Sequence, residues 1–148
     1  GGLEMALWCD LRIAEEGAIL GVFNRRFGIP LVDGGSVRLP RLIGMGHALD
    51  LILTGRPVDA DEALAIGLVN RVVPDHGALV AATQLAQELC ELPQACLRGD
   101  RRSAFEQWGL TEQEAMTNEF AIGKQVLDAT WEEAADHFLT SRGDKGVN

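Results

Sequence analysis

The 148-residue chain is long enough to form a hydrophobic core, and its apolar content of 47% is too high for a disordered segment. A formal net charge of −9 disfavours nucleic acid as a partner, because phosphate binding requires a basic surface. No apolar run is long enough to cross a membrane, no signal peptide is visible, and the three cysteines lack metal-ligand spacing. We therefore expect a cytoplasmic protein with reduced thiols that binds neither membranes nor metals.

The start of the chain predicts a short helix that contains one carboxylate. Glu4 is the only charged side chain between Gly1 and Asp10, and the residues around it favour helix. A helix that is apolar on all sides is normally buried, and burying a lone carboxylate is costly. Gly1 and Gly2 would place free backbone N–H groups beside it. Glu4 is therefore either a general base next to an oxyanion site or a carboxylate that only complements the helix dipole.

Two short strands and a loop are expected next. Alternation of apolar and polar residues predicts a strand over residues 10–15, and an apolar run predicts a second over 18–23. Residues 24–35 then read as a loop. This loop contains Asn24, Arg25, Gly28, Pro30 and Asp33. Because an aspartate before two glycines is typical of a turn, a turn residue is the favoured interpretation of Asp33, and a functional acid is the alternative.

Short helices and one further strand follow the loop. The pattern predicts helices over residues 36–43, 47–53 and 60–66, and a strand over 69–73. Gly44 and Gly46 separate the first two helices. Asp59 and Glu62 resemble a capping box at the start of the third, and Gly67 is placed to end it.

The second half of the sequence predicts helices alone. Apolar residues at helical spacing predict one helix over 79–90, closed by Pro93, and another that ends at Gly109. Thr-x-x-Glu capping boxes at residues 111–114 and 130–133 predict two further helices. The three tryptophans of the chain are expected to be core or interface anchors.

Three motifs along this chain together resemble one protein family. They are GGLEMALWCD at residues 1–10, GIPLVDGGS at 28–36, and the run from LTGR to VVP at 53–74. In this order and spacing they resemble the crotonase (enoyl-CoA hydratase/isomerase) superfamily, but only roughly the later half of a member. The resemblance implies an α/β fold in which residues 1–76 form the later turns of a ββα spiral. Residues 77–148 would form the C-terminal helical region that makes trimer contacts in the family.

The resemblance also implies a site for acyl thioesters of coenzyme A. In the family, two backbone N–H groups hold the thioester oxygen as it becomes an enolate, and one of them matches Gly1. Two glutamates of the hydratases handle the water and the proton, and Glu4 matches the first of them. The second matches Asn24, which can hold a water but cannot exchange protons at neutral pH. Asp33 is the nearest substitute acid.

Other family contacts fall in the same loop. Gly1, Gly28, Pro30 and Arg25 are the candidates for binding coenzyme A, although a solvated loop residue is the favoured interpretation of Arg25. Coenzyme A would be part of the substrate, and no separate cofactor is required. The expected partner is a second copy of the chain, in a trimer or a dimer of trimers.

Three functions are consistent with the resemblance. The first is hydration of a 2-enoyl-CoA with Glu4 as the base. The second is double-bond isomerisation, in which Glu4 or Asp33 moves one proton. The third is a non-catalytic acyl-CoA-binding or assembly remnant, which the substitution at Asn24 and the short chain favour and the retained pair of Gly1 and Glu4 opposes. Hydration is the favoured interpretation of the three.

Overall fold

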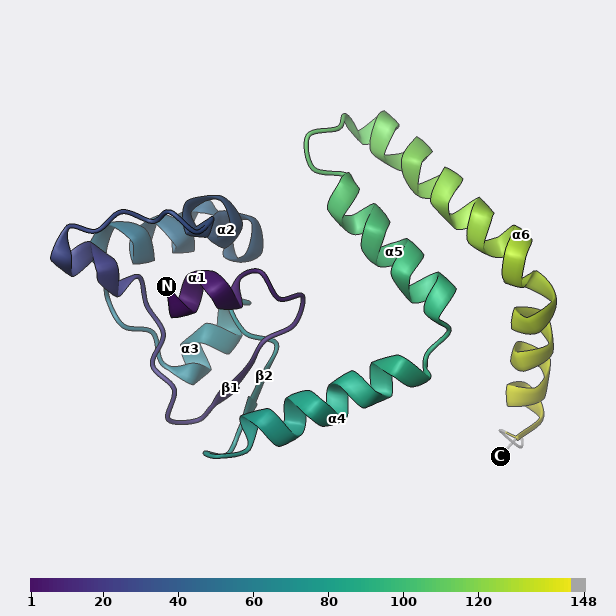
Figure 1. The fold of residues 1–148 in the computed structure, drawn as a ribbon, viewed down its shortest axis with the longest axis horizontal. Helices are drawn as coiled ribbons and strands as arrows, with labels where there is room; N and C mark the ends of the chain where they lie inside the picture. The colour runs from purple at the N-terminus through teal and green to yellow at the C-terminus, as the bar shows by residue number, and fades with distance from the viewer. Residues whose placement is uncertain (145–148) are drawn as a thin grey trace. The chain divides into compact units, whose positions relative to one another are not determined.

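A computed structural model describes residues 1–144, apart from the side chains of residues 133, 134, 137 and 141–144. The chain divides into two compact units, Gly1–Ala86 and Gln87–Asn148 (Figure 1). The last four residues of the predicted C-terminal region, 145–148, lie outside the described residues. No helix within the described part of the chain is both long and apolar enough to cross a membrane.

The first unit packs short helices around two parallel strands (Figure 1). Its elements are α1 (Gly2–Ala6), β1 (Ile13–Glu15), η1 (Phe23–Phe27), α2 (Gly35–Thr54), α3 (Ala60–Ala65), β2 (Arg71–Val73) and the start of α4 (Ala78–Glu91). In the sheet, Ile13 pairs with Arg71 and Glu15 with Val73. The core is centred on apolar side chains with no exposed surface, among them Leu39, Leu51, Val58, Ala63 and Leu68.

The predicted second strand, over residues 18–23, is wrong. Leu20 forms only a single antiparallel bridge with Val58, in which each backbone N–H donates to the other residue's carbonyl at 2.8 Å. The pairing cannot extend, because the N–H of Arg56 is already bonded to Thr54 Oγ1 and Ala60 begins α3. The chain instead turns into the 3₁₀ helix η1, which occupies the start of the segment predicted as a loop.

The two helices predicted after the loop are both present within the element α2. A kink at Gly44, with φ 77° and ψ 157°, separates them as predicted, whereas Gly46 does not interrupt the second one. Asp59 caps α3 by accepting the Glu62 N–H at 2.8 Å. The capping box is only half formed, because the Glu62 carboxylate binds Arg56 instead. Gly67 follows α3 with a positive φ of 77°, as predicted.

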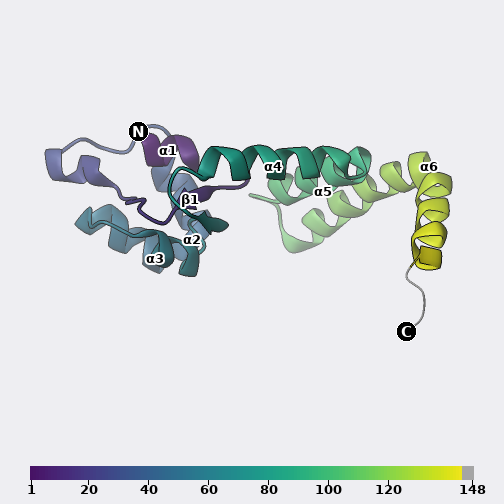
Figure 2. The same ribbon diagram turned by 90° about the horizontal axis from the view of Figure 1, so that it is seen from below.

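The second unit begins with the end of α4 and continues as α5 (Gln94–Glu106) and α6 (Glu112–Asp144), which lie side by side in both ribbon views (Figures 1 and 2). A Cβ added to Gly99 of α5 would lie 3.1 Å from Val126 Cγ2, so the small residue allows α6 to approach closely. The capping box at residues 111–114 is confirmed, since Glu114 accepts bonds from the Thr111 backbone and hydroxyl.

The helix start predicted at residues 130–133 is wrong, because α6 runs through it without a break. The Thr130 hydroxyl donates to the Val126 carbonyl at 2.9 Å, a bond that a threonine inside a helix can make. The side chain of Glu133 lies outside the described residues.

Candidate active site

Glu4 is buried at the start of the chain and held by a distant loop. Only 5% of the residue is exposed. Its Oε1 accepts hydrogen bonds from the backbone N–H of Gly35 at 2.9 Å and of Asp33 at 3.1 Å. These amides lie at and just before the start of α2, where the helix dipole favours negative charge. Glu4 therefore complements the dipole of α2, and not only that of its own five-residue helix.

The second carboxylate oxygen of Glu4 has a different environment. No described residue donates to Oε2, and no buried side-chain oxygen in the described part of the chain lacks a hydrogen-bond partner. Glu4 lines a cavity, and its Oε2, which accepts no bond from a described residue, is the oxygen available to a group bound there. The carboxylate is thus fixed through one oxygen and open through the other, as a proton-transfer group must be.

The cavity beside Glu4 has a volume of about 420 Å³ and lies within the first unit. Glu4 and Asn24 carry the only polar side chains in its described lining, and Glu4 is the only charged one. The apolar lining comes from α1, the segment before η1, the loop and α2: Leu3, Leu7, Ile19, Leu20, Val22, Phe23, Leu31 and Leu39. The space therefore suits an apolar group placed next to a single carboxylate.

Asn24 lines the cavity and also fastens the loop that follows it. Its Nδ2 donates to the Ile29 carbonyl at 2.9 Å, and the Ile29 N–H donates back to the Asn24 carbonyl at 3.1 Å. The amide nitrogen is therefore used for loop structure, which leaves Oδ1 as its free polar atom. An acid at this position would lack the donor that closes the loop.

The predicted site residues other than Gly1, Glu4 and Asn24 lie outside the cavity lining. Asp33 is exposed; its backbone binds Glu4, while a catalytic role for its carboxylate stays a prediction. Gly28 ends η1 with φ 70°, and both Gly28 and Pro30 are exposed. Arg25 Nε donates to the Ile52 carbonyl at 3.1 Å. Gly1 does line the cavity, and the coenzyme A contacts of all these residues stay predictions.

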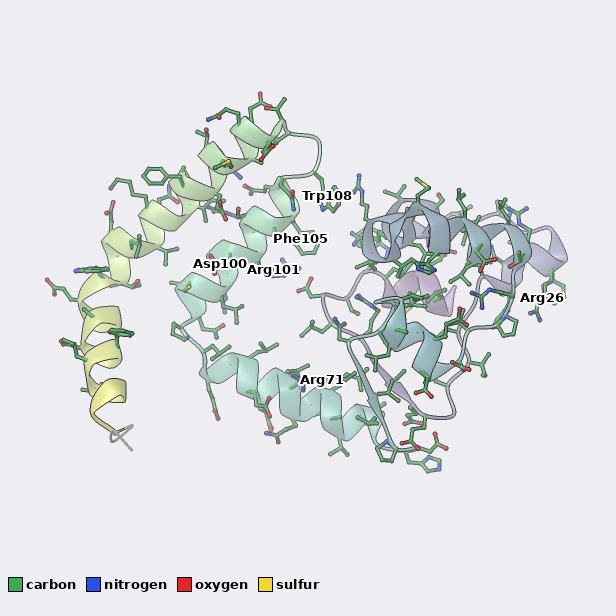
Figure 3. The ribbon with its side chains drawn as sticks, turned by 180° about the vertical axis from the view of Figure 1, so that it is seen from behind. Arg26, Arg71, Asp100, Arg101, Phe105 and Trp108 are labelled. Atoms are coloured by element: carbon green, nitrogen blue, oxygen red, sulfur yellow. The ribbon has the colours of Figure 1, made fainter. Side chains whose placement is uncertain are left out.

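Arg26 follows the same pattern as its neighbour Arg25. Its Nε donates to the Gly55 carbonyl at 3.0 Å, and its guanidinium lies 4.7 Å from the centroid of the Phe23 ring. The residue lies at the outer edge of the first unit (Figure 3). Both arginines thus bind carbonyls at the end of α2, where a cation is favoured by the helix dipole.

Arg12 is a structural residue that sequence analysis missed. It is 8% exposed, and it donates from Nε to the Leu68 carbonyl at 2.8 Å and from Nη1 to the Cys9 carbonyl at 2.6 Å. Burial lowers the pKa of this guanidinium from its usual value. It joins the end of the Glu4 segment to the turn after α3. An arginine in an alternating strand pattern gives no local sign of this, because the Leu68 carbonyl that its Nε binds lies 56 residues further along the sequence.

Trp8 is a second residue whose role was missed. Its Nε1 donates to the Asp33 carbonyl at 2.8 Å, and the guanidinium carbon of Arg38 lies 3.6 Å from its ring centroid. The expectation of a core or interface anchor did not include a bond to the loop that holds Glu4. Among the described residues, no group of His, Cys, Asp or Glu side chains is arranged to hold a metal ion.

Comparison with known proteins identifies the family. A family model described as enoyl-CoA hydratase/isomerase matches residues 1–143. The chain belongs to the enoyl-CoA hydratase/isomerase (crotonase) family. It is 44% identical over 97 residues to the human mitochondrial enoyl-CoA hydratase domain-containing protein 2, covering 64% of this chain and 33% of that one. It is also 44% identical over 90 residues to the fatty acid oxidation complex subunit alpha of Shewanella frigidimarina, covering 60% and 13%.

Solved structures of family members share the fold. An enoyl-CoA hydratase from Mycobacterium tuberculosis superposes with a TM-score of 0.89 at 29% identity, covering 95% of this chain and 56% of that one. One from Geobacillus kaustophilus gives 0.88 at 32% identity, covering 95% and 55%. The predicted family and fold class are confirmed. The chain spans about half the length of these structures and a third or less of the curated relatives named above.

Proposed function

We propose that the chain forms the later half of a site that hydrates a 2-enoyl-CoA thioester, with Glu4 as the proton-transfer group. The observation that supports this most directly is the environment of its carboxylate. Two backbone N–H groups fix one oxygen, and the other opens onto an apolar cavity. Gly1 lines the same cavity at the start of α1 and is the proposed oxyanion donor. The acyl group would occupy the apolar part of the cavity.

One carboxylate is sufficient for a balanced hydration. Glu4 Oε2 takes a proton from water, and the hydroxide adds to C3 of the enoyl group. The electron pair moves onto the thioester oxygen, where backbone N–H groups stabilise the enolate. Glu4 then returns its proton to C2, which restores the carboxylate and completes the addition of water. Asn24 cannot supply this proton, but its Oδ1 can hold the water.

Isomerisation is the second candidate, because Glu4 is the only acidic side chain in the described cavity lining. Moving a double bond from C3 to C2 needs one group that removes a proton from C2 and returns it to C4. Glu4 alone meets that need without a water. A non-catalytic acyl-CoA-binding or assembly role is the third possibility, and it predicts that substitution of Glu4 leaves every rate unchanged.

The test compares Glu4→Gln with Glu16→Gln, an exposed carboxylate in the same unit. It is made in a complete family protein that carries residues 1–148 as its later half, since the chain alone lacks one oxyanion donor of the proposed site. Loss of the conjugated enoyl-thioester absorbance should slow by at least about 10²-fold in Glu4→Gln, the usual range for a general acid–base group. Glu16→Gln should match the wild type. Near-normal rates of both hydration and isomerisation in Glu4→Gln would reject the proposal.

We also propose self-association, most simply with threefold symmetry. The second unit exposes large apolar side chains on both helices and on the turn that joins them: Phe105, Trp108, Leu110, Met116, Phe120, Leu127, Trp131, Phe138 and Leu139. Arg101, Phe105 and Trp108 lie on the side of α5 away from α6 (Figure 3). An apolar surface on this scale supports contact with another chain. Light scattering that gives only a compact monomer at micromolar concentration would contradict this.

A further inference from the structure

The loop that binds Glu4 presents its peptide groups in alternating directions. The N–H groups of Asp33 and Gly35 both donate to Glu4 Oε1. The carbonyl of Asp33, which belongs to the peptide group between those two amides, accepts instead from Trp8 Nε1 at 2.8 Å. Converging backbone N–H groups of this kind form a concave site for an anion. The Asp33–Gly34 peptide is thus the middle member of the site that holds the carboxylate.

This middle peptide needs something to fix its direction. Gly34 has a φ of 93°, and a glycine tolerates either sign of φ. Rotation of the peptide would turn the Asp33 carbonyl towards the side from which the amides reach Glu4, where it would repel the carboxylate. The indole donor on one side and the carboxylate on the other select the same orientation.

Trp8 is itself held in place. The guanidinium of Arg38, in the first turns of α2, stacks 3.6 Å from the indole centroid, and Arg38 Nη1 donates to the Leu7 carbonyl at 3.4 Å. A Cβ added to Gly34 would lie 3.7 Å from Trp8 Nε1, so the indole packs directly against this turn. These contacts fix the indole in one position although 58% of the residue is exposed.

We propose that Trp8 is a positioning residue for Glu4, acting through the Asp33–Gly34 peptide. Its N–H holds that peptide so that the two flanking amides converge on Oε1, which leaves Oε2 directed at the cavity. The catalytic meaning of this role rests on the function proposed for Glu4. The positioning itself is measurable without turnover, so failure of the hydration assay and failure of this inference are distinguishable.

The first measurement is amide hydrogen exchange on ¹⁵N-labelled residues 1–148. Trp8→Phe keeps an aromatic ring and removes the donor, and Trp131→Phe makes the same change in the second unit. Exchange at the Asp33 and Gly35 amides should be about 3–10-fold faster in Trp8→Phe, the effect expected for one hydrogen bond. Trp131→Phe should leave both amides unchanged.

The second measurement changes Glu4 and follows the indole N–H resonance of Trp8. In Glu4→Gln, the indole N–H resonance of Trp8 should shift, while those of Trp108 and Trp131 stay in place. A purely structural tryptophan would not respond to the charge of Glu4. Asp33→Asn is the control for the nearby exposed carboxylate and should leave the protection of Gly35 intact.

Unchanged exchange at Asp33 and Gly35 in folded Trp8→Phe would overturn the proposal. So would a Trp8 indole resonance that is the same in Glu4→Gln and in the wild type. If Trp8→Phe unfolds the first unit, all its amides lose protection together, and the indole shift in Glu4→Gln then decides.

Discussion

Gly35→Ala tests whether close approach of Glu4 to α2 is required. A Cβ at residue 35 would lie 2.8 Å from Glu4 Oε1 and 2.9 Å from its Cγ. Since non-bonded heavy atoms settle at about 3.5–4.0 Å, the carboxylate or the start of α2 must move by roughly 0.5–1 Å. That displacement would break or weaken the hydrogen bond that Gly35 donates to Glu4 at 2.9 Å.

The size of the effect follows from these contacts. Overpacking costs about 1–3 kcal/mol, and loss of a hydrogen bond to a charged group costs a similar amount. Replacing glycine by alanine where the backbone allows it stabilises a protein by about 0.4–1 kcal/mol, because it lowers the conformational entropy of the unfolded chain. The two costs do not add, because moving the carboxylate away from the new methyl group relieves the overpacking but breaks the hydrogen bond. We therefore expect a net decrease of about 1–3 kcal/mol in the free energy of unfolding. In the complete protein, displacing the carboxylate by about 1 Å should lower turnover by about 10²-fold.

Gly46→Ala is the matched control within α2. A Cβ there has nothing within 4 Å, and its φ is not positive. This variant should be as stable as the wild type or slightly more stable. Urea unfolding followed by circular dichroism compares the two, and the enoyl-thioester assay compares their rates. If Gly35→Ala matches Gly46→Ala in both measurements, Glu4 does not depend on close contact with α2.

Two further predictions concern acid stability and the second acid position. Hydrogen bonds from Arg56 lower the pKa of Glu62 below its usual 4.5. This ion pair therefore stabilises the fold above pH 4.5, and its contribution is lost as the pH falls through the lowered pKa. The stability difference between wild type and Arg56→Met should shrink as urea unfolding is repeated at decreasing pH, and a constant difference would contradict this origin. Asn24→Glu places a second acid at the cavity. In the complete protein it should hydrate a 2-enoyl-CoA faster than Asn24→Ala does. Equal rates for the two variants would show that the missing acid does not limit the rate of hydration.

The sequence identified Glu4 but not what holds it. A lone charge in an apolar segment is a local signal, and the family motifs locate the same residue. Its partners, the amides of Asp33 and Gly35, follow 29 and 31 residues later, and local sequence spacing does not predict contacts over that distance. The bond from Trp8 to Asp33 and the bond from Arg12 to Leu68 are long-range in the same way. The local sequence pattern identifies candidate functional groups. Their contacts depend on which distant segments the fold brings together.

The errors in secondary structure have a related cause. The apolar run at residues 18–23 has the composition of a strand. Its pairing with the segment around Val58 cannot extend, because the Arg56 N–H already donates to Thr54 Oγ1. The Thr-x-x-Glu pattern was right at residues 111–114, after the turn at Gly109. The same pattern at 130–133 lies inside α6, where the Thr130 hydroxyl bonds to its own helix. Each signal depends on whether the neighbouring backbone groups are already satisfied.

The central claim is that Glu4 exchanges a proton with the α-carbon of an acyl-CoA thioester. Hydration and isomerisation share this step, so the test does not depend on which of them is correct. A complete protein carrying residues 1–148 is incubated with butyryl-CoA in D₂O, and deuterium at C2 is measured by mass spectrometry. Wild type and Glu16→Gln should incorporate deuterium, and Glu4→Gln should do so at least about 10²-fold more slowly. Incorporation at the wild-type rate in Glu4→Gln would contradict the account.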